Sequence, residues 1–478
     1  MKDTENALQM LDYEYGKEDE KRINLMLSRY VGGCDRVFVV IDDDPTGGQT
    51  VNGIDVYTGW TREDILGAFK KPDYMFYIMT NSRSLLAEET AAVQKEIMQN
   101  LLYASEITNR RFEVISRGDS TLRGHYPLET DVLKECISEG DIKELVIPYF
   151  REGNRYTIED IHYLYEEGRL IPAGESEFSR DRTFGYHNSD LKLWIEEKTK
   201  GSCPAGNVGS ISLEMLRKLD FHAIIGVLSN QSYEKIIVNA ACDMDLKVFA
   251  ICYHQMLMKG VRFIARTASS WPKAVGNIAE IPYIQAEDIA DGNNRCGGLI
   301  IIGSHVNKTT KQLEELKKSS LRLEYIEFNQ QLVLNPEQLK QEIRRVWRLA
   351  NEAIAGGITA AVYTRRERID LNTGNREDEL MITRQIADAV TEIAGGIDIK
   401  PRFVIVKGGI TSSDIAVKAF RTKRAKILGQ VIAGVPVWRL GEESRYPGLA
   451  YIIFPGNVGD KDALKTVVQE LTRKQTDQ

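Results

Sequence analysis

The sequence predicts an α/β protein with two domains, each built on a mostly parallel sheet that helices flank. Short runs of apolar, often β-branched residues alternate along the chain with stretches of helical spacing. These runs are continuous and do not alternate with polar residues, which is typical of strands buried on both faces of a parallel sheet. A chain of 478 residues is long enough for two or three domains with large cores.

The first half of the chain begins with a charged segment, residues 1–35, which we predict to be an N-terminal extension. A first domain is predicted over residues 36–285, with strands at 36–42, 74–80, 112–119, 144–149, 223–228 and 246–252. Helical spacing over 87–107 predicts a long helix between two of them. Between residues 151 and 215 the pattern loosens, and an insertion of that length is typically functional or interfacial.

The second half of the chain repeats the same alternation. A polar segment rich in Gly and Asn, residues 285–298, marks the boundary, so the second domain is predicted over 286–478. Its strands are predicted at 299–304, 359–364, 403–409 and 449–456.

Composition and charge exclude several classes of protein. The 62 basic and 69 acidic residues give a net charge of -7, which argues against nucleic acid as a partner. The six cysteines and six histidines show no metal-binding spacing, so we assign no metal ligand. The chain has neither a signal-peptide pattern nor a run of the ~18 apolar residues that a membrane span needs. We therefore expect a cytoplasmic protein with no membrane partner.

Polar residues gather at the ends of three predicted strands of the first domain. The carboxyl ends of parallel strands line ligand sites, so these residues are candidates for one pocket. Carboxylates, hydroxyls and arginines together suit a small polyhydroxylated acid, because arginine binds a carboxylate through two hydrogen bonds and aspartate accepts from hydroxyls. For any single residue, a helix cap or a surface ion pair fits equally well. The candidates are Asp42, Asp43, Asp44, Thr80, Asn81, Ser82, Arg83, Ser116, Arg117, Asp119, Ser120 and Arg123.

In the second domain, three predicted strands end in small-residue turns that lead towards helices. Such turns bind anions, because free backbone N–H groups and the helix dipole favour phosphate. One pair of glycines alone is more often a tight turn, but three such turns in one domain indicate a nucleotide. Neither a P-loop nor a G-x-G-x-x-G fingerprint is present. The turns contain Gly303 and Ser304; Gly408, Gly409 and Thr411; and Gly456 and Gly459.

At these residues the sequence resembles the four-carbon acid sugar kinase family, DUF1537. The Asp-Asp-x-Thr-Gly element of the family matches residues 43–47, its Ser-Arg pair matches Ser82 and Arg83, and Asp-Ser-Thr-Leu-Arg-Gly matches residues 119–124 in full. The chain departs from many members by having Ile410 in place of an acid, a Phe-Pro-Gly-Asn-Val-Gly turn at 454–459, and Asp42 in place of alanine. We therefore expect Asp42 to be structural.

The resemblance implies an N-terminal domain that holds a sugar acid, a C-terminal domain that holds ATP with Mg²⁺, and an active site in the cleft between them. The implied reaction is phosphorylation of a terminal hydroxyl of a small, four-carbon acid such as threonate, erythronate or an oxo-tetronate. The implied substrate-binding residues are Asp43, Arg83, Asp119, Ser120, Thr121, Leu122 and Arg123. The implied nucleotide-binding residues are Ser304, Gly408, Gly409, Ile410, Thr411 and Gly456.

For the mechanism, we hypothesise that Arg83 and Arg123 clamp the substrate carboxylate, while Asp43 or Asp44 orients the hydroxyl and accepts its proton. Two alternatives stay open. One is a binding protein that keeps the kinase fold without catalysis, and the other is a nicotinamide-dependent dehydrogenase, which lacks its glycine fingerprint here. The sequence also leaves open whether the chain forms a homodimer.

Overall fold

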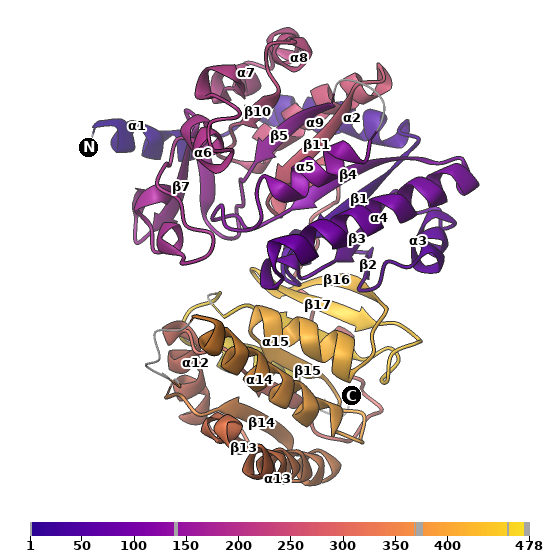
Figure 1. Ribbon diagram of the computed structural model, residues 1–478, viewed down its shortest axis with the longest axis vertical. Coiled ribbons are helices and arrows are strands. Elements are labelled where there is room, and N and C mark those ends of the chain that lie inside the picture. Colours follow the sequence, from indigo (N-terminus) through magenta and orange to yellow (C-terminus); the bar gives the residue numbers. More distant parts are fainter. Residues whose placement is uncertain (1, 138–141, 368, 370–375, 457, 473–478) are drawn as a thin grey trace. The chain divides into compact units, whose positions relative to one another are not determined.

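The chain folds into two compact units, each built on strands that helices flank. The structure, a computed structural model, describes residues 2–137, 142–367, 369, 376–456 and 458–472. Unit 1 comprises residues 1–51 and 59–280, and unit 2 comprises residues 52–58 and 281–478. Helices flank the mainly parallel strands of both units, which confirms the predicted α/β class with two domains (Figure 1).

Seven parallel strands form the sheet of unit 1, in the order β3-β1-β4-β11-β5-β10-β9. In chain order they are β1 (Arg36–Asp42), β3 (Met75–Met79), β4 (Arg111–Arg117), β5 (Ile142–Ile147), β9 (Val208–Ile211), β10 (Lys235–Val238) and β11 (Arg262–Thr267). The helices are α1 (Lys2–Leu11), α2 (Lys17–Gly32), α3 (Arg62–Phe69), α4 (Ala87–Thr108), α5 (Leu128–Glu135), α6 (Leu191–Lys198), α7 (Leu213–Arg217), α8 (Phe221–Ser229), α9 (Asp243–Met258) and α10 (Ser270–Val275).

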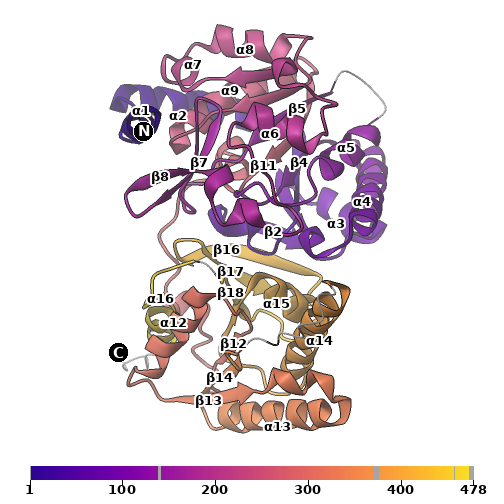
Figure 2. The same cartoon turned by 60° about the vertical axis from the view of Figure 1, so that its left-hand side comes forward.

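Helices cover both faces of this sheet, which explains the continuous apolar runs in its strands. All seven residues of β1 are buried, as are all five of β3. Helices α3, α4 and α5 lie on one side of the sheet, while α2 and α9 lie on the other (Figure 2). A strand between two helical layers has no solvent-facing side, so polar side chains concentrate where the strands end.

Two strand predictions of the first half are wrong. Residues 223–228 lie in α8 and residues 246–252 lie in α9. Asp220 precedes helix α8 and caps it, because its side chain accepts a hydrogen bond from the backbone N–H of Ala223. Helix α9 is buried along most of its length. A short apolar run does not distinguish a buried strand from a buried helix, and both of these runs are helical.

The loosely patterned segment after residue 150 contains a small antiparallel sheet, and the charged N-terminal segment packs onto unit 1. The small sheet consists of β6 (Arg155–Ile158), β7 (Ile161–Glu166) and β8 (Arg169–Pro172). The Tyr15 hydroxyl donates a hydrogen bond to Asp245 of α9 at 2.8 Å. Residues 1–35 are therefore an integral part of unit 1.

Unit 2 has a mixed sheet. Its strands run in the order β13-β14-β12-β15-β18-β17-β16-β2, parallel as far as β18 and antiparallel beyond it. They are β2 (Ile54–Tyr57), β12 (Leu299–Ile302), β13 (Leu323–Phe328), β14 (Thr359–Thr364), β15 (Val404–Lys407), β16 (Arg424–Ile432), β17 (Val435–Leu440) and β18 (Ala450–Phe454). The helices are α11 (Ala286–Ile289), α12 (Asn307–Lys317), α13 (Pro336–Ala355), α14 (Arg376–Gly395), α15 (Gly409–Asp414) and α16 (Ala463–Thr472).

Strand β2 shows that the division between the units differs from the predicted one. The sequence places residues 52–58 in the first domain, but β2 pairs with β16 in the sheet of unit 2. The second crossing lies after residue 280, near the predicted boundary at 285. Pairing of one short strand with a distant partner leaves no local signal, because the strand pattern is the same in either sheet.

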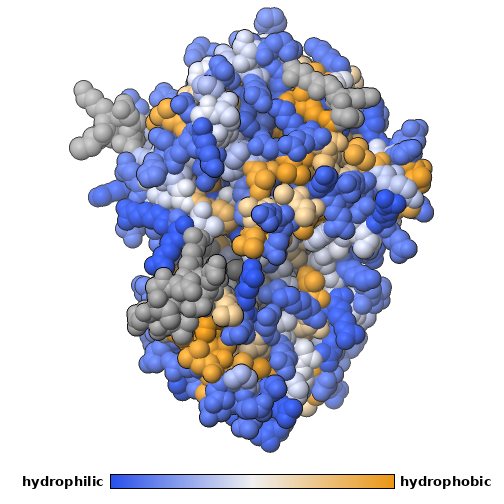
Figure 3. All heavy atoms as spheres, viewed as in Figure 1, coloured by the Kyte–Doolittle hydropathy of each residue, from blue (hydrophilic) through white to orange (hydrophobic). Residues whose placement is uncertain are grey.

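The face of the molecule shown in Figure 3 is mainly hydrophilic, with hydrophobic side chains in separate patches. No helix among the described residues is long and apolar enough to cross a bilayer.

Candidate functional site

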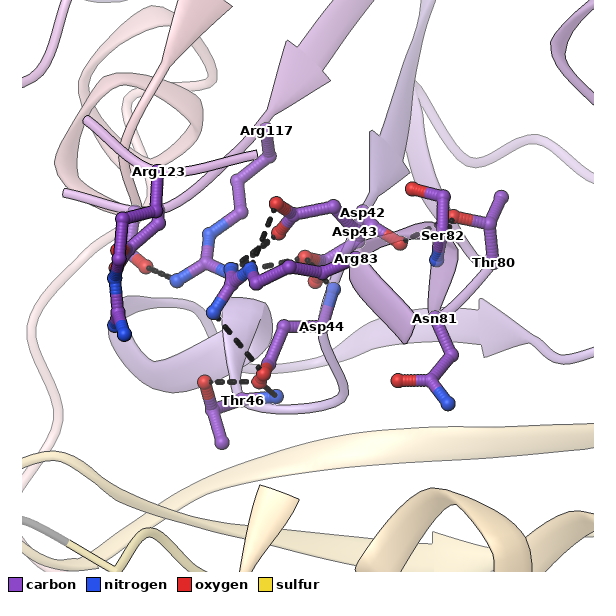
Figure 4. A network of polar contacts seen from close by, with 12 residues as sticks. Asp42, Asp43, Asp44, Thr46, Thr80, Asn81, Ser82, Arg83, Arg117 and Arg123 are labelled. Carbon is purple, nitrogen blue, oxygen red and sulfur yellow. Dashed lines mark hydrogen bonds and ion pairs between the residues drawn. The ribbon is translucent and has the colours of Figure 1, made fainter. Parts of the chain in front are cut away.

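The carboxyl ends of β1, β3, β4 and β11 bring the predicted strand-end residues of unit 1 together. Asp42 lies opposite Met79 of β3 and Arg117 of β4 in the strand register. Because neighbouring parallel strands end at one edge, the residues that follow them share that edge. Figure 4 shows the result, in which Arg83 and Arg117 point towards the three consecutive aspartates that end and follow β1.

Asp42 is buried at the base of this site. Its carboxylate forms an ion pair with Arg117 at 3.1 Å, and Arg117 also donates to the Ser269 hydroxyl at 2.9 Å. Burial raises the pKa of Asp42 to about 7, although Arg117 favours its charged form. The Asp42 carboxylate also packs directly against Gly47, which leaves no room for a side chain there.

Asp43 and Asp44 share one arginine. Arg83 grips Asp43 with two hydrogen bonds, at 2.6 and 3.0 Å, and reaches Asp44 at 3.3 Å. Asp44 also accepts from the backbone N–H of Thr46 at 2.8 Å and from the Thr46 hydroxyl at 2.5 Å. Burial alone would raise the pKa of Asp44, but Arg83, Arg117 and the Thr46 hydrogen bonds hold it below its ordinary value. Asp44 is therefore a carboxylate at neutral pH.

The loop of residues 118–124 forms the next wall of the site. Arg123 donates to Asp119 at 2.7 Å, and the Thr121 hydroxyl donates to the same carboxylate oxygen. Burial alone would raise the pKa of Asp119, but the two nearby arginines, Arg123 first, and these hydrogen bonds lower it far below its usual range. The guanidinium of Arg266, at the end of β11, holds the loop by donating to the backbone carbonyls of Asp119 and Arg123 at 3.0 and 3.1 Å.

Two residues of this loop, Ser120 and Leu122, make contacts that stabilise the fold. The carbonyl of Ser120 accepts a hydrogen bond from His162 at 2.7 Å, and burial lowers the pKa of His162 to about 3, so the imidazole is neutral. The Leu122 side chain is fully buried in a hydrophobic cluster with Tyr126 and Trp194, and its backbone is left-handed, with φ of 66°. Its side chain therefore points into the core, away from the site.

Glu129, in the first turn of α5, belongs to the site although the sequence analysis missed it. It is buried and accepts hydrogen bonds from the Ser82 hydroxyl at 2.7 Å and from Gln94 at 3.4 Å. Burial, reinforced by the charge of Asp43, raises the pKa of Glu129 to about 7. An acidic residue one turn after the 119–124 motif was the available signal.

An arginine that the sequence analysis also missed comes from the loosely patterned segment after residue 150. Arg155, at the start of β6, and Arg123 both lie over the ring of Phe178, at 5.6 and 5.0 Å from its centroid. Asp181 lies 3.6 Å from Arg123. The segment after residue 150 thus supplies a wall to the site, where two cations share one aromatic face.

In unit 2 the three small-residue turns converge around Ser304. Backbone N–H groups of Gly303 and Ser304 both reach the Lys407 carbonyl at 3.2 Å, and the N–H of Gly408 donates to the Phe454 carbonyl at 3.0 Å. A Cβ atom on Gly456 would lie 2.6 Å from the Ser304 hydroxyl oxygen. The turns therefore approach one another so closely that only glycine fits at this position.

The remaining predicted nucleotide residues lie in the same turn cluster. Gly408 has φ of 132°, a conformation that favours glycine, and Gly409 begins α15. A Cβ atom on Gly303 would lie 2.8 Å from the Thr411 hydroxyl oxygen. The side chain of Ile410 lies outside the described residues.

The start of α12 is the part of this cluster best suited to an anion. The N–H groups of Gly303, Ser304 and Gly408 are bonded to main-chain carbonyls, whereas α12 begins beside Ser304 without a side-chain cap on its first N–H groups. Within the described ranges, no group of three His, Cys, Asp or Glu side chains could hold a metal ion.

Comparisons with known proteins give the same two-part organisation. A sugar-binding N-terminal domain matches residues 38–275, and a nucleotide-binding C-terminal domain matches residues 299–464. Among curated proteins no sequence matches this chain.

Two solved structures share the fold. A Haemophilus influenzae protein assigned to DUF1537 has a TM-score of 0.61 at 16% identity, over 91% of this chain and 100% of its own. A Salmonella typhimurium LT2 protein, named provisionally as a tRNA synthase, has a TM-score of 0.63 at 13% identity, over 90% and 98%. The two domain matches, in this order along one chain, and the shared fold show that the protein belongs to the four-carbon acid sugar kinase family, DUF1537.

Proposed function

We propose that the protein is an ATP-dependent kinase that phosphorylates a terminal hydroxyl of a small sugar acid, most simply a four-carbon acid such as threonate, erythronate or an oxo-tetronate. The observation that carries the proposal is the cluster of Asp43, Asp44, Arg83 and Arg123 at strand ends of the domain that matches a sugar-binding family. ATP with Mg²⁺ supplies the phosphoryl group, and the Ser304 turn cluster is the proposed place for it.

Arg123 is the better candidate for binding the substrate carboxylate. Its Nε is anchored by Asp119, and its Nη1 makes only an ion pair with Asp181 at 3.6 Å, which is longer than a hydrogen bond. Arg83, by contrast, already donates two hydrogen bonds to the Asp43 carboxylate. We therefore assign carboxylate binding to Arg123 and the positioning of the aspartates to Arg83.

Asp44 is the better candidate for orienting the attacking hydroxyl. Its side chain is 15% exposed against 3% for Asp43, and only one bond of 3.3 Å joins it to Arg83. Asp43 is held on both oxygens, so it has less capacity left for a substrate. Phosphoryl transfer needs positioning more than proton abstraction, so a carboxylate of low pKa suffices for this role.

The test is an ADP-release assay across threonates, erythronates and their 2- and 3-oxo relatives, with five- and six-carbon acids as controls. The proposal expects release with at least one four-carbon acid and little with the longer acids. Binding of ATP and of an acid without release from any of them would overturn the kinase proposal and support a binding protein instead. Binding and reduction of NAD with these acids would support the dehydrogenase alternative.

A further inference from the structure

Lys407 is a buried lysine at the centre of the turn cluster of unit 2. It is the last residue of β15, and its side chain has no exposed surface. Its ammonium donates one hydrogen bond, to the Pro455 carbonyl at 2.9 Å, and lies 3.8 Å from the centroid of the Phe454 ring. An ammonium has three donors, so one carbonyl and one ring satisfy it incompletely.

No carboxylate pairs with Lys407 among the residues that the structure describes. The buried Lys235 of unit 1 shows the contrast, because it forms an ion pair with Glu144 at 2.5 Å. Burial lowers the pKa of Lys407 to about 7, and the positive charge of Lys308 on α12 contributes in the same direction. A buried cation without a counter-ion is costly, and an anionic ligand would relieve that cost.

A second cation without a carboxylate partner in the described chain contacts the Ser304 turn. Arg366 follows β14 and donates to the Ser304 carbonyl at 2.7 Å and to the Thr310 hydroxyl at 2.8 Å. Its buried Nη1 makes no hydrogen bond to any described residue. The backbone N–H of Ser304 donates to the main-chain carbonyl of Lys407 at 3.2 Å. The Ser304 turn thus contacts Arg366 and the strand end that carries Lys407, and no described acid pairs with either cation.

We propose that Lys407 and Arg366 are phosphate-binding residues, which hold the phosphate chain of the nucleotide at the Ser304 turn. The inference rests on the proposed function in that it takes the nucleotide to be ATP, and it adds which cations recognise the phosphates. A basic pair of this kind selects a di- or triphosphate over an uncharged nucleoside, because the free energy comes from charge-assisted hydrogen bonds.

Nucleotide binding should then depend on pH. A phosphate beside Lys407 favours its charged form, so binding above neutral pH takes up a proton at this amine. The charged group that acts on this amine is Lys308 on α12, whose positive charge also opposes protonation of Lys407. Affinity for ADP should therefore fall as the pH rises from 7 to 9.

The experiment compares wild type, Lys407→Met and Arg366→Gln by isothermal titration with ADP, adenosine and inorganic tripolyphosphate. We expect each variant to lose affinity for ADP and tripolyphosphate on the order of 10- to 100-fold, while adenosine affinity stays within about 3-fold. Lys400→Met is the matched control, because Lys400 also donates to a proline carbonyl, that of Pro447 at 2.8 Å, at an exposed position. It should bind like wild type.

Proton uptake supplies an independent readout. ADP titrations at pH 8 in two buffers of different ionisation enthalpy should show uptake in wild type and less in Lys407→Met, which a purely structural lysine would not produce. Equal losses for adenosine and ADP, or unchanged ADP affinity in both variants, would overturn the inference while leaving ATP binding intact. If wild type binds ADP and tripolyphosphate through these residues but releases ADP from ATP with no sugar acid, the inference stands and the proposed function fails; if it binds neither ADP nor tripolyphosphate, both fail.

Discussion

Asp42 and Gly47 are in such close contact that a Cβ atom on the glycine would lie 1.7 Å from Oδ2 of the aspartate. Asp42 ends strand β1, and its carboxylate also forms an ion pair with Arg117. The turn that carries Asp43 and Asp44 therefore folds back over Asp42 and packs on it without a spacer. Through this contact Asp42 helps to position Asp43 and Asp44.

Gly47→Ala should destabilise unit 1 and displace the turn that carries Asp44. The added methyl group overlaps the Asp42 carboxylate, which the Arg117 ion pair holds in place, so the backbone must move. We expect a loss on the order of 2–4 kcal/mol in the free energy of unfolding, measured with urea, and a large loss of turnover.

The matched control for this change is Gly67→Ala in α3. A Cβ atom at Gly67 meets nothing within 4 Å, and alanine favours a helix over glycine by about 1 kcal/mol. This variant should be as stable as wild type or more stable. Equal stability of Gly47→Ala and wild type would contradict the packing described for Asp42.

Asp44→Asn should reduce turnover more than Asp42→Asn does. An amide at position 44 still accepts from Thr46 but lacks the charge that orients the substrate hydroxyl and favours loss of its proton, so kcat should fall on the order of 10²- to 10⁴-fold. Asp42 is buried below the turn. Asp42→Asn leaves Arg117 without a partner charge on that side, so its main effect should be a lower free energy of unfolding. Steady-state kinetics and urea titrations on both variants separate the two roles. Near wild-type kcat in Asp44→Asn would refute the assignment.

Much of this site follows from the sequence, because the residues concerned lie next to recognisable strands. Asp43, Arg83 and Arg123 each follow a strand of continuous apolar residues, and a parallel sheet brings such ends to one edge. Glu129 and Arg155 could not be found in that way. One lies in the first turn of a helix and the other begins a strand of a separate small sheet, so their approach depends on tertiary packing.

The fold shows the same division between local and distant information. The predicted helix over 87–107 is confirmed by α4, because a long amphipathic stretch has a period that strands do not share. Helix α9 was predicted as a strand, since it is buried on nearly all sides and shows no such period. Strand β2 was given to the wrong unit, because its partner β16 is distant in sequence.

Arg123→Ala should raise KM for the sugar acid with a smaller effect on kcat. Arg123 is anchored through Nε by Asp119, and its outer nitrogens, held only by the 3.6 Å ion pair of Nη1 with Asp181, can bind a ligand carboxylate. Loss of a charge-assisted pair corresponds to an increase in KM on the order of 10- to 100-fold. Arg123→Lys should recover part of this, since it keeps the charge but not the planar fork.

The control for Arg123 is Arg180→Ala, an exposed arginine in the same part of unit 1. It should leave both KM and kcat unchanged. If Arg123→Ala lowers kcat and leaves KM unchanged, the arginine acts on the reacting end of the substrate and the carboxylate assignment is wrong.

Glu129→Gln should make the stability of the protein less sensitive to pH between 5 and 8. The pKa of Glu129 is raised to about 7 in the folded state, above its ordinary value near 4.5. Between these values the folded state holds a proton that the unfolded state has lost, so stability is greatest below the ordinary value and falls as the pH rises through 7. The full effect is on the order of 3 kcal/mol. Glutamine keeps an acceptor for the Ser82 hydroxyl and cannot ionise. Urea titrations at pH 5 and pH 8 should therefore show a smaller loss of unfolding free energy in Glu129→Gln than in wild type. The loss that remains should come from Asp42, whose pKa is also about 7.

The control is Glu135→Gln, at the exposed end of the same helix, which should keep the wild-type pH profile of stability. A wild-type profile in Glu129→Gln would show that Glu129 is ionised in the folded protein.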